Sequence, residues 1–172
     1  MRTWPVAELR LRHVVGGVAM QVWPLLGLVV LFVGGAAVWH VVSGDHSLID
    51  VAAGFGQVVV VGLVGSFALH EVAHVVLLRC PPGVTHITLE RTAWRFSVAP
   101  LGTLSAREVG LVALAGPGAC LLAAPVWWMV LPESGLAWWY AAHLVFLLPL
   151  FGDGRMLVAS VRAGALKTGW RA

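Results

Sequence analysis

Long apolar stretches separated by short polar segments dominate this chain of 172 residues. Four stretches, at about residues 14–42, 51–79, 109–131 and 136–162, are long enough to cross a bilayer as helices. In the region 85–98 the period changes to an alternation of apolar and polar residues, which predicts a β-hairpin or a pair of short strands. An ordinary cytoplasmic loop is the alternative for that region. We therefore expect an all-α membrane protein, a single integral membrane domain over residues 1–172, with four transmembrane helices and a short membrane-associated β-hairpin between helices 2 and 3.

Composition and charge placement agree with a protein of the lipid bilayer. The chain is 59% hydrophobic and only 11% charged, which is typical of membrane proteins. All 11 Lys and Arg residues precede the first stretch, lie between the second and third, or lie at or after the end of the fourth. The connections 43–50 and 132–135 contain none, so the positive-inside rule predicts a multi-pass cell-membrane protein with both termini in the cytoplasm. Because orientation explains the net charge of +3, that charge does not indicate nucleic-acid binding.

The second stretch carries an HExxH motif formed by His70, Glu71 and His74. Residues four apart on a helix lie on one face, so both imidazoles can bind one metal ion, with Glu71 on the adjoining face. No other side chain between Val51 and Leu78 is formally charged. Ionisable groups at that depth in a bilayer are costly and mark functional sites. We therefore expect a metal site at the two histidines, with Glu71 as the catalytic residue.

A typical catalytic zinc site has three protein ligands, and Asp153 is the only carboxylate within the fourth stretch. His70 lies nine residues before Arg79, and Asp153 lies nine residues before Arg162, so the two side chains are expected at similar depth. An aspartate between two glycines is also common in ordinary turns, which is the alternative for Asp153. His143 lies ten residues before Asp153, about three helical turns away, and is expected to be a hydrogen-bonded core residue.

Three motifs, in this order, resemble those of the site-2 protease family of intramembrane zinc metalloproteases. They are the HExxH motif, a Gly-Pro motif at Ala115-Gly116-Pro117, and an Asp-Gly motif within Leu147–Arg155. The resemblance covers about residues 51–162. It implies that zinc is bound by His70, His74 and Asp153, that Glu71 is the general base, and that a small membrane-embedded sheet follows the HExxH helix.

The family's substrate-holding positions correspond here to Gly116, Pro117, Cys120 and Phe146. The family often has asparagine at the last two of these positions, so this chain departs from the pattern there.

The resemblance implies a zinc-dependent intramembrane endopeptidase (a hydrolase). Its substrate would be a transmembrane or membrane-associated peptide or protein, cleaved near the cytoplasmic face. The departures at Cys120 and Phe146 favour an alternative: a membrane subunit that modifies, binds or exports a peptide together with a partner membrane protein, without hydrolysis. A metal-binding membrane protein that catalyses no hydrolysis is the third possibility.

Overall fold

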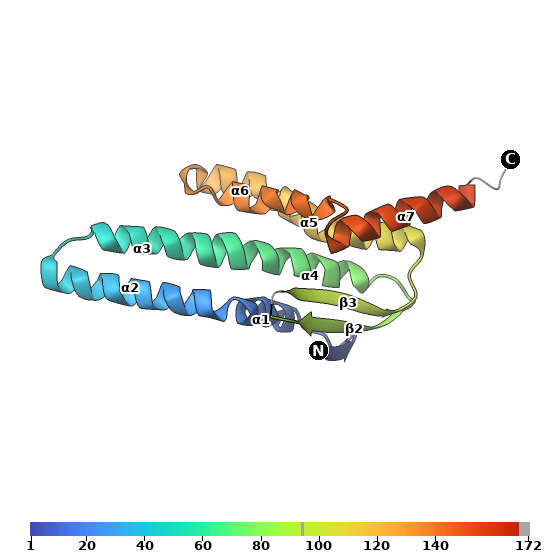
Figure 1. Cartoon of the computed structure of the whole chain (residues 1–172), viewed down its shortest axis with the longest axis horizontal. Helices are drawn as coiled ribbons and strands as arrows, with labels where there is room; N and C mark the ends of the chain where they lie inside the picture. The colour runs from blue at the N-terminus through green and yellow to red at the C-terminus, as the bar shows by residue number, and fades with distance from the viewer. Residues whose placement is uncertain (94, 169–172) are drawn as a thin grey trace.

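The structure, a computed structural model, describes residues 1–93 and 95–168 and is mostly helical (Figure 1). The long helix Ser47–Leu78 lies between the helix Trp23–Ser43 on one side and the helices Ala106–Val130 and Leu136–Ala141 on the other. In chain order the elements are β1 (Arg2–Pro5), α1 (Leu11–Gln21), α2 (Trp23–Ser43), α3 (Ser47–Gln57), a π-helical segment (Val58–Gly65), α4 (Ser66–Leu78), β2 (Val84–Arg91), β3 (Phe96–Gly102), α5 (Ala106–Val130), a 3-10 turn (Pro132–Ser134), α6 (Leu136–Ala141), a 3-10 segment (Ala142–Leu147) and α7 (Gly152–Thr168).

Three helices in the described part of the chain are long and apolar enough to cross a membrane: Trp23–Ser43, Ser47–Leu78 and Ala106–Val130. A fourth candidate is the pair Leu136–Leu147 and Gly152–Gly164, which is bent by 45° at its break. The prediction of a mostly helical chain is therefore confirmed, and the four predicted spans correspond to three candidate spans, or four if the bent pair is counted as one. The second, third and fourth candidates begin and end within a few residues of the predicted limits.

The predicted first span, 14–42, with the soft break that Pro24 predicts, is divided into two helices in the structure. The chain breaks at Val22 (φ −108°, ψ 21°), and Pro24 lies in the first turn of α2. Proline is tolerated there because its missing N–H would have no partner, whereas inside a helix its ring clashes with the carbonyl four residues earlier. The helix before the break, α1, buries Val14 and Val18, and Val14 belongs to the same core cluster as residues of α4 and β2. Only residues 23–43 form the first candidate span.

The predicted hairpin is confirmed, and the loop alternative is wrong. Strands β2 and β3 pair antiparallel with Leu89 opposite Val98, while Trp94 in their connection lies outside the described residues. A third strand, β1, pairs with the other edge of β2, with Trp4 opposite Ile87, so that the order is β1-β2-β3. This N-terminal strand was not predicted.

The main core joins the sheet to the helices that carry the HExxH motif and the Gly-Pro motif. It comes from the α1 region, α4, β2 and α5, and contains Leu9, Val14, Val75, Leu78, Val84, Ile87 and Val112. The Arg79 guanidinium donates a hydrogen bond to the Leu9 carbonyl, which fixes the end of α4 against the segment before α1. In Figure 1 the α2–α3 turn and the α5–α6 connection point to one end of the long axis, and the sheet lies away from that end.

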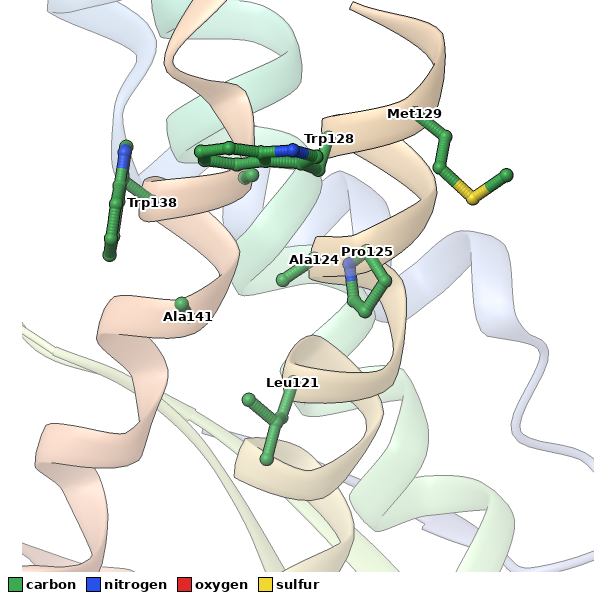
Figure 2. Close-up of a pocket in the computed structure, with 8 residues that line it drawn as sticks. Leu121, Ala124, Pro125, Trp128, Met129, Trp138 and Ala141 are labelled. Carbon is green, nitrogen blue, oxygen red and sulfur yellow. The ribbon is translucent and has the colours of Figure 1, made fainter. Parts of the chain in front are cut away.

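A cavity of about 350 Å³ lies between α5 and α6 (Figure 2). None of its lining side chains is ionisable: they are Leu121, Ala124, Pro125, Trp128, Met129, Ala137, Trp138 and Ala141. The figure shows the indole of Trp128 on α5 and that of Trp138 on α6 at the same end of this cavity. Acid–base chemistry therefore has to come from another part of the chain.

Candidate functional site

The two motif histidines lie on one face of α4, as the spacing predicts. Both are buried, with 5% of His70 and 7% of His74 exposed. Their Nε2 atoms are 3.0 Å apart, and their rings stand nearly perpendicular at 78°. Two nitrogens of the same kind therefore converge on one point inside the protein.

Asp153 joins the histidines from the first turn of α7. Its Oδ2 lies 3.1 Å from His70 Nε2, and its Oδ1 lies 3.5 Å from His74 Nε2. The three side chains form a group whose ligand atoms could hold a metal ion. The break before α7 makes this approach possible, and it requires glycine at 154, where a Cβ would lie 2.0 Å from the Leu148 carbonyl oxygen. The predicted meeting of these three residues is therefore found in the structure.

Helix α5 approaches the same nitrogens closely at Gly116. A Cβ at that position would lie 2.6 Å from His74 Nε2 and 2.7 Å from His70 Nε2. One turn earlier on α5, the Val112 carbonyl accepts a hydrogen bond of 2.8 Å from His74 Nδ1. Because a carbonyl oxygen only accepts, the His74 proton sits on Nδ1 and its Nε2 lone pair is free to bind a metal. A metal-binding histidine commonly has such a partner on its second nitrogen.

Glu71 lines a second cavity, of about 540 Å³, together with His70 and Asp153. Only 8% of Glu71 is exposed, and the Val98 N–H of β3 lies close enough to interact with its carboxylate. The other lining residues come from the end of α1 and the residue after it, the π-helical segment, the start of α4, the β2–β3 connection and β3. The rest belong to the 3-10 segment, the break after it and the start of α7. The cavity is therefore in direct contact with two of the candidate ligands, His70 and Asp153, and with the predicted base.

The four predicted substrate positions differ in where the structure places them. Phe146 lines the 540 Å³ cavity, and its ring centroid lies 5.3 Å from that of His70. Gly116 faces the histidine nitrogens. Pro117 and Cys120 are fully buried and do not line that cavity, and the Cys120 thiol donates to the Ser66 carbonyl at 3.3 Å. Direct contact of Pro117 and Cys120 with a substrate stays a prediction.

His143 lies near the site, although the sequence did not predict this position. It is a hydrogen-bonded core residue, as predicted, with Nδ1 3.0 Å from the Trp139 carbonyl oxygen. Its ring centroid also lies 5.3 Å from that of His70, and the pair forms a second group of possible ligands with Cys120. The number of helical turns between His143 and Asp153 does not predict this contact, because the span is bent by 45° between the two residues.

Comparisons of the chain with protein-family models, with curated proteins and with solved structures give no match.

Proposed function

We propose that this protein is a zinc-dependent intramembrane endopeptidase that cleaves a membrane-embedded or membrane-proximal peptide near the cytoplasmic face. The observation that carries the proposal is the meeting of His70, His74 and Asp153, which come from two separate helices, beside Glu71. The resemblance to site-2 proteases in the HExxH, Gly-Pro and Asp-Gly motifs supports the same function.

The donor set and its spacing fit zinc. Ligand atoms about 2.0–2.1 Å from a tetrahedral zinc ion lie about 3.3 Å from one another. The separations among the two Nε2 atoms and the Asp153 oxygens are 3.0, 3.1 and 3.5 Å. Two histidines and one carboxylate are a donor set found in catalytic zinc sites, which keep a fourth position open. When bound, zinc lowers the pKa of a water ligand towards neutrality and polarises a carbonyl group.

Glu71 is placed to move the proton in this reaction. It follows His70 directly in α4 and lines the same cavity as His70 and Asp153. Its carboxylate would accept a proton from the attacking water and then deliver it to the nitrogen of the departing peptide half. Its near-complete burial keeps bulk water away from this transfer.

Strand β3 offers a surface that can hold an extended substrate. It pairs with β2 along one edge only among the described residues, and its first residues, Phe96 and Ser97, line the cavity beside Glu71. A helical substrate hides its carbonyls in hydrogen bonds, so it has to unwind before hydrolysis. A peptide added to the free edge of β3 would exchange those hydrogen bonds for new ones along the strand.

The proposed setting is a cell membrane crossed by the four candidate spans, with both termini in the cytoplasm. The basic residues are absent from 43–50 and 132–135. These two connections lie at the same end of the molecule, away from the sheet (Figure 1). This arrangement supports an orientation with the sheet towards the cytoplasm. Arg171, one of the basic residues counted in the prediction, lies outside the described residues.

The proposal is tested with Glu71→Gln, which keeps the size of the side chain and removes the base. Purified wild type and variant are placed in liposomes with a library of single-span peptides, and cleavage products are identified by mass spectrometry. We expect the variant to retain its zinc and to lose hydrolysis, whereas Glu133→Gln, an exposed change in the α5–α6 connection, behaves as wild type. Equal cleavage by wild type and Glu71→Gln would show that Glu71 is not the base.

A non-hydrolytic subunit is the second candidate function, and the wall of the cavity favours it. Phe146 lines the cavity with an apolar ring. The Cys120 thiol donates its hydrogen bond to the Ser66 carbonyl, between α5 and α4. Neither side chain can donate the amide hydrogen bonds that would hold an unwound peptide. Co-purification of a second membrane protein, with biological activity that survives Glu71→Gln, would favour this function over hydrolysis.

A further inference from the structure

His143 has a buried nitrogen whose hydrogen-bonding role is fixed by its neighbour. Only 3% of the residue is exposed, and Nδ1 is 3.0 Å from the Trp139 carbonyl oxygen. Because that oxygen can only accept, Nδ1 carries the proton and Nε2 of the neutral ring is an acceptor. Among the described residues this Nε2 is buried without a hydrogen-bond partner. Buried polar atoms rarely lack a partner, so Nε2 requires a donor.

In His70, by contrast, it is a buried hydrogen-bond donor that lacks a partner. Its Nε2 faces His74 and Asp153, so in the proposed zinc site this nitrogen supplies its lone pair and the proton sits on Nδ1. That Nδ1 is also buried without a partner in the described part of the chain. The other ligand, His74, donates its Nδ1 proton to the Val112 carbonyl. Metal-binding histidines nearly always donate a hydrogen bond from the second nitrogen, and no carbonyl of the described residues accepts one from His70.

The two histidines with unpaired buried nitrogens lie side by side. Their ring centroids are 5.3 Å apart, and His70, His143 and Cys120 each offer a ligand atom within 4.8 Å of the others. Phe67 and Phe146 pack against the His143 ring, with centroids 4.9 and 5.4 Å away. At a ligand-atom separation of at most 4.8 Å, a single bridging water can join a donor on one ring to an acceptor on the other.

We propose that His143 is a positioning residue of the zinc site: its Nε2 accepts a hydrogen bond from the Nδ1–H of His70, directly or through one water. This inference rests on the proposed zinc site. The hydrogen bond would fix the tautomer of His70 and hold its Nε2 towards Asp153 and His74. The backbone carbonyl of Val112 orients His74 in the same way. One zinc ligand would therefore be oriented by a side chain and the other by the backbone.

The experiment measures zinc affinity by chelator competition, and zinc content, on the full-length protein in nanodiscs. His143→Phe keeps an aromatic ring and removes the acceptor, whereas His143→Gln keeps an acceptor oxygen near the position of Nε2. Loss of such a partner typically weakens metal affinity about 10- to 100-fold. We therefore expect that loss in His143→Phe and recovery in His143→Gln. Tyr140→Phe, a matched control one turn earlier, removes a buried hydroxyl that bonds to Val61 and should leave zinc affinity unchanged.

A spectroscopic readout separates positioning from a general effect on folding. In protein labelled with ¹⁵N-histidine, the His70 Nδ1–H should give a slowly exchanging NMR signal in wild type and in His143→Gln. If His143→Phe does not fold, the affinity and the signal of His143→Gln still decide. Loss of affinity in the Gln variant equal to that in the Phe variant would overturn the proposal, because the acceptor would then not be what matters.

Other outcomes are equally distinct. Wild-type affinity in His143→Phe would overturn the positioning role while the zinc site stands. If wild type holds two zinc ions per chain and Cys120→Ala loses one of them, the positioning role is wrong and a second metal site exists at His70, Cys120 and His143. A wild type that binds no zinc would reject both the positioning role and the proposed function.

Discussion

Replacing Gly116 with alanine tests the close approach of α5 to the proposed zinc ligands. The new Cβ would lie 2.6 Å from His74 Nε2 and 2.7 Å from His70 Nε2, about 0.7–0.8 Å inside the 3.4 Å at which ordinary contact begins. Metal–ligand distances in a working site vary by only about 0.2 Å. Without metal, the rings can rotate away from the methyl group. Holding both nitrogens on one ion restores the clash, so the strain falls on the bound state.

The expected magnitude follows from the cost of overpacking a buried site. Such changes cost about 1–3 kcal/mol, which corresponds to about a 5- to 150-fold loss of zinc affinity. Gly118→Ala is the matched control, because it lies on the same helix with nothing within 4 Å of its added Cβ. Both substitutions gain up to about 1 kcal/mol of helix propensity, so only the clash distinguishes them.

The assay is chelator competition for zinc on both variants, with the free energy of unfolding in detergent measured in parallel. We expect weakened zinc binding in Gly116→Ala and wild-type binding in Gly118→Ala. The reasoning would be refuted by a Gly116→Ala protein that binds zinc as tightly as wild type. It would also fail if both variants lost affinity equally.

Three further predictions concern the break before α7, the orientation and the start of α5. Gly154→Ala should abolish zinc binding, because its Cβ would meet backbone oxygen at 2.0 Å, whereas Gly152→Ala, with nothing within 4 Å, should retain it; zinc content after purification compares them. A cysteine at Ser47 should react with a membrane-impermeant maleimide on intact cells, and the native, exposed Cys80 only after the membrane is opened; the reverse order would contradict the orientation. Ser105→Ala removes the hydroxyl that caps α5 by accepting a hydrogen bond from the Glu108 N–H. It should lower the free energy of unfolding, measured by chemical denaturation, by about 0.5–2 kcal/mol and leave the zinc content unchanged.

Much of the candidate site could be predicted from local sequence. The four-residue spacing of His70 and His74 fixes their common face on any helix, and this did not depend on the rest of the fold. Asp153 could be matched to them because the predicted direction of two apolar spans gives its expected depth. The hairpin could be predicted because alternation of apolar and polar residues is itself a local signal.

The features that were missed depend on contacts between distant segments. The four residues of β1 carry no alternation of their own, and they form a strand because β2 offers an unpaired edge. Pro24 predicts a soft break in the first apolar stretch, but the packing of α1 against α4 and the sheet decides where each half lies. The contact between His143 and His70 requires the bent span to pack against α4, which no spacing within one segment reveals.

The most direct test of the zinc site is the metal content of wild type and Asp153→Ala, measured by mass spectrometry of the elements after purification. Gel filtration of both proteins in the same detergent confirms that they are folded alike. We predict about one zinc ion per chain in wild type, because two histidines and one carboxylate converge there, and almost none in the variant. Wild type without zinc, or Asp153→Ala with its full complement, would contradict the proposed site.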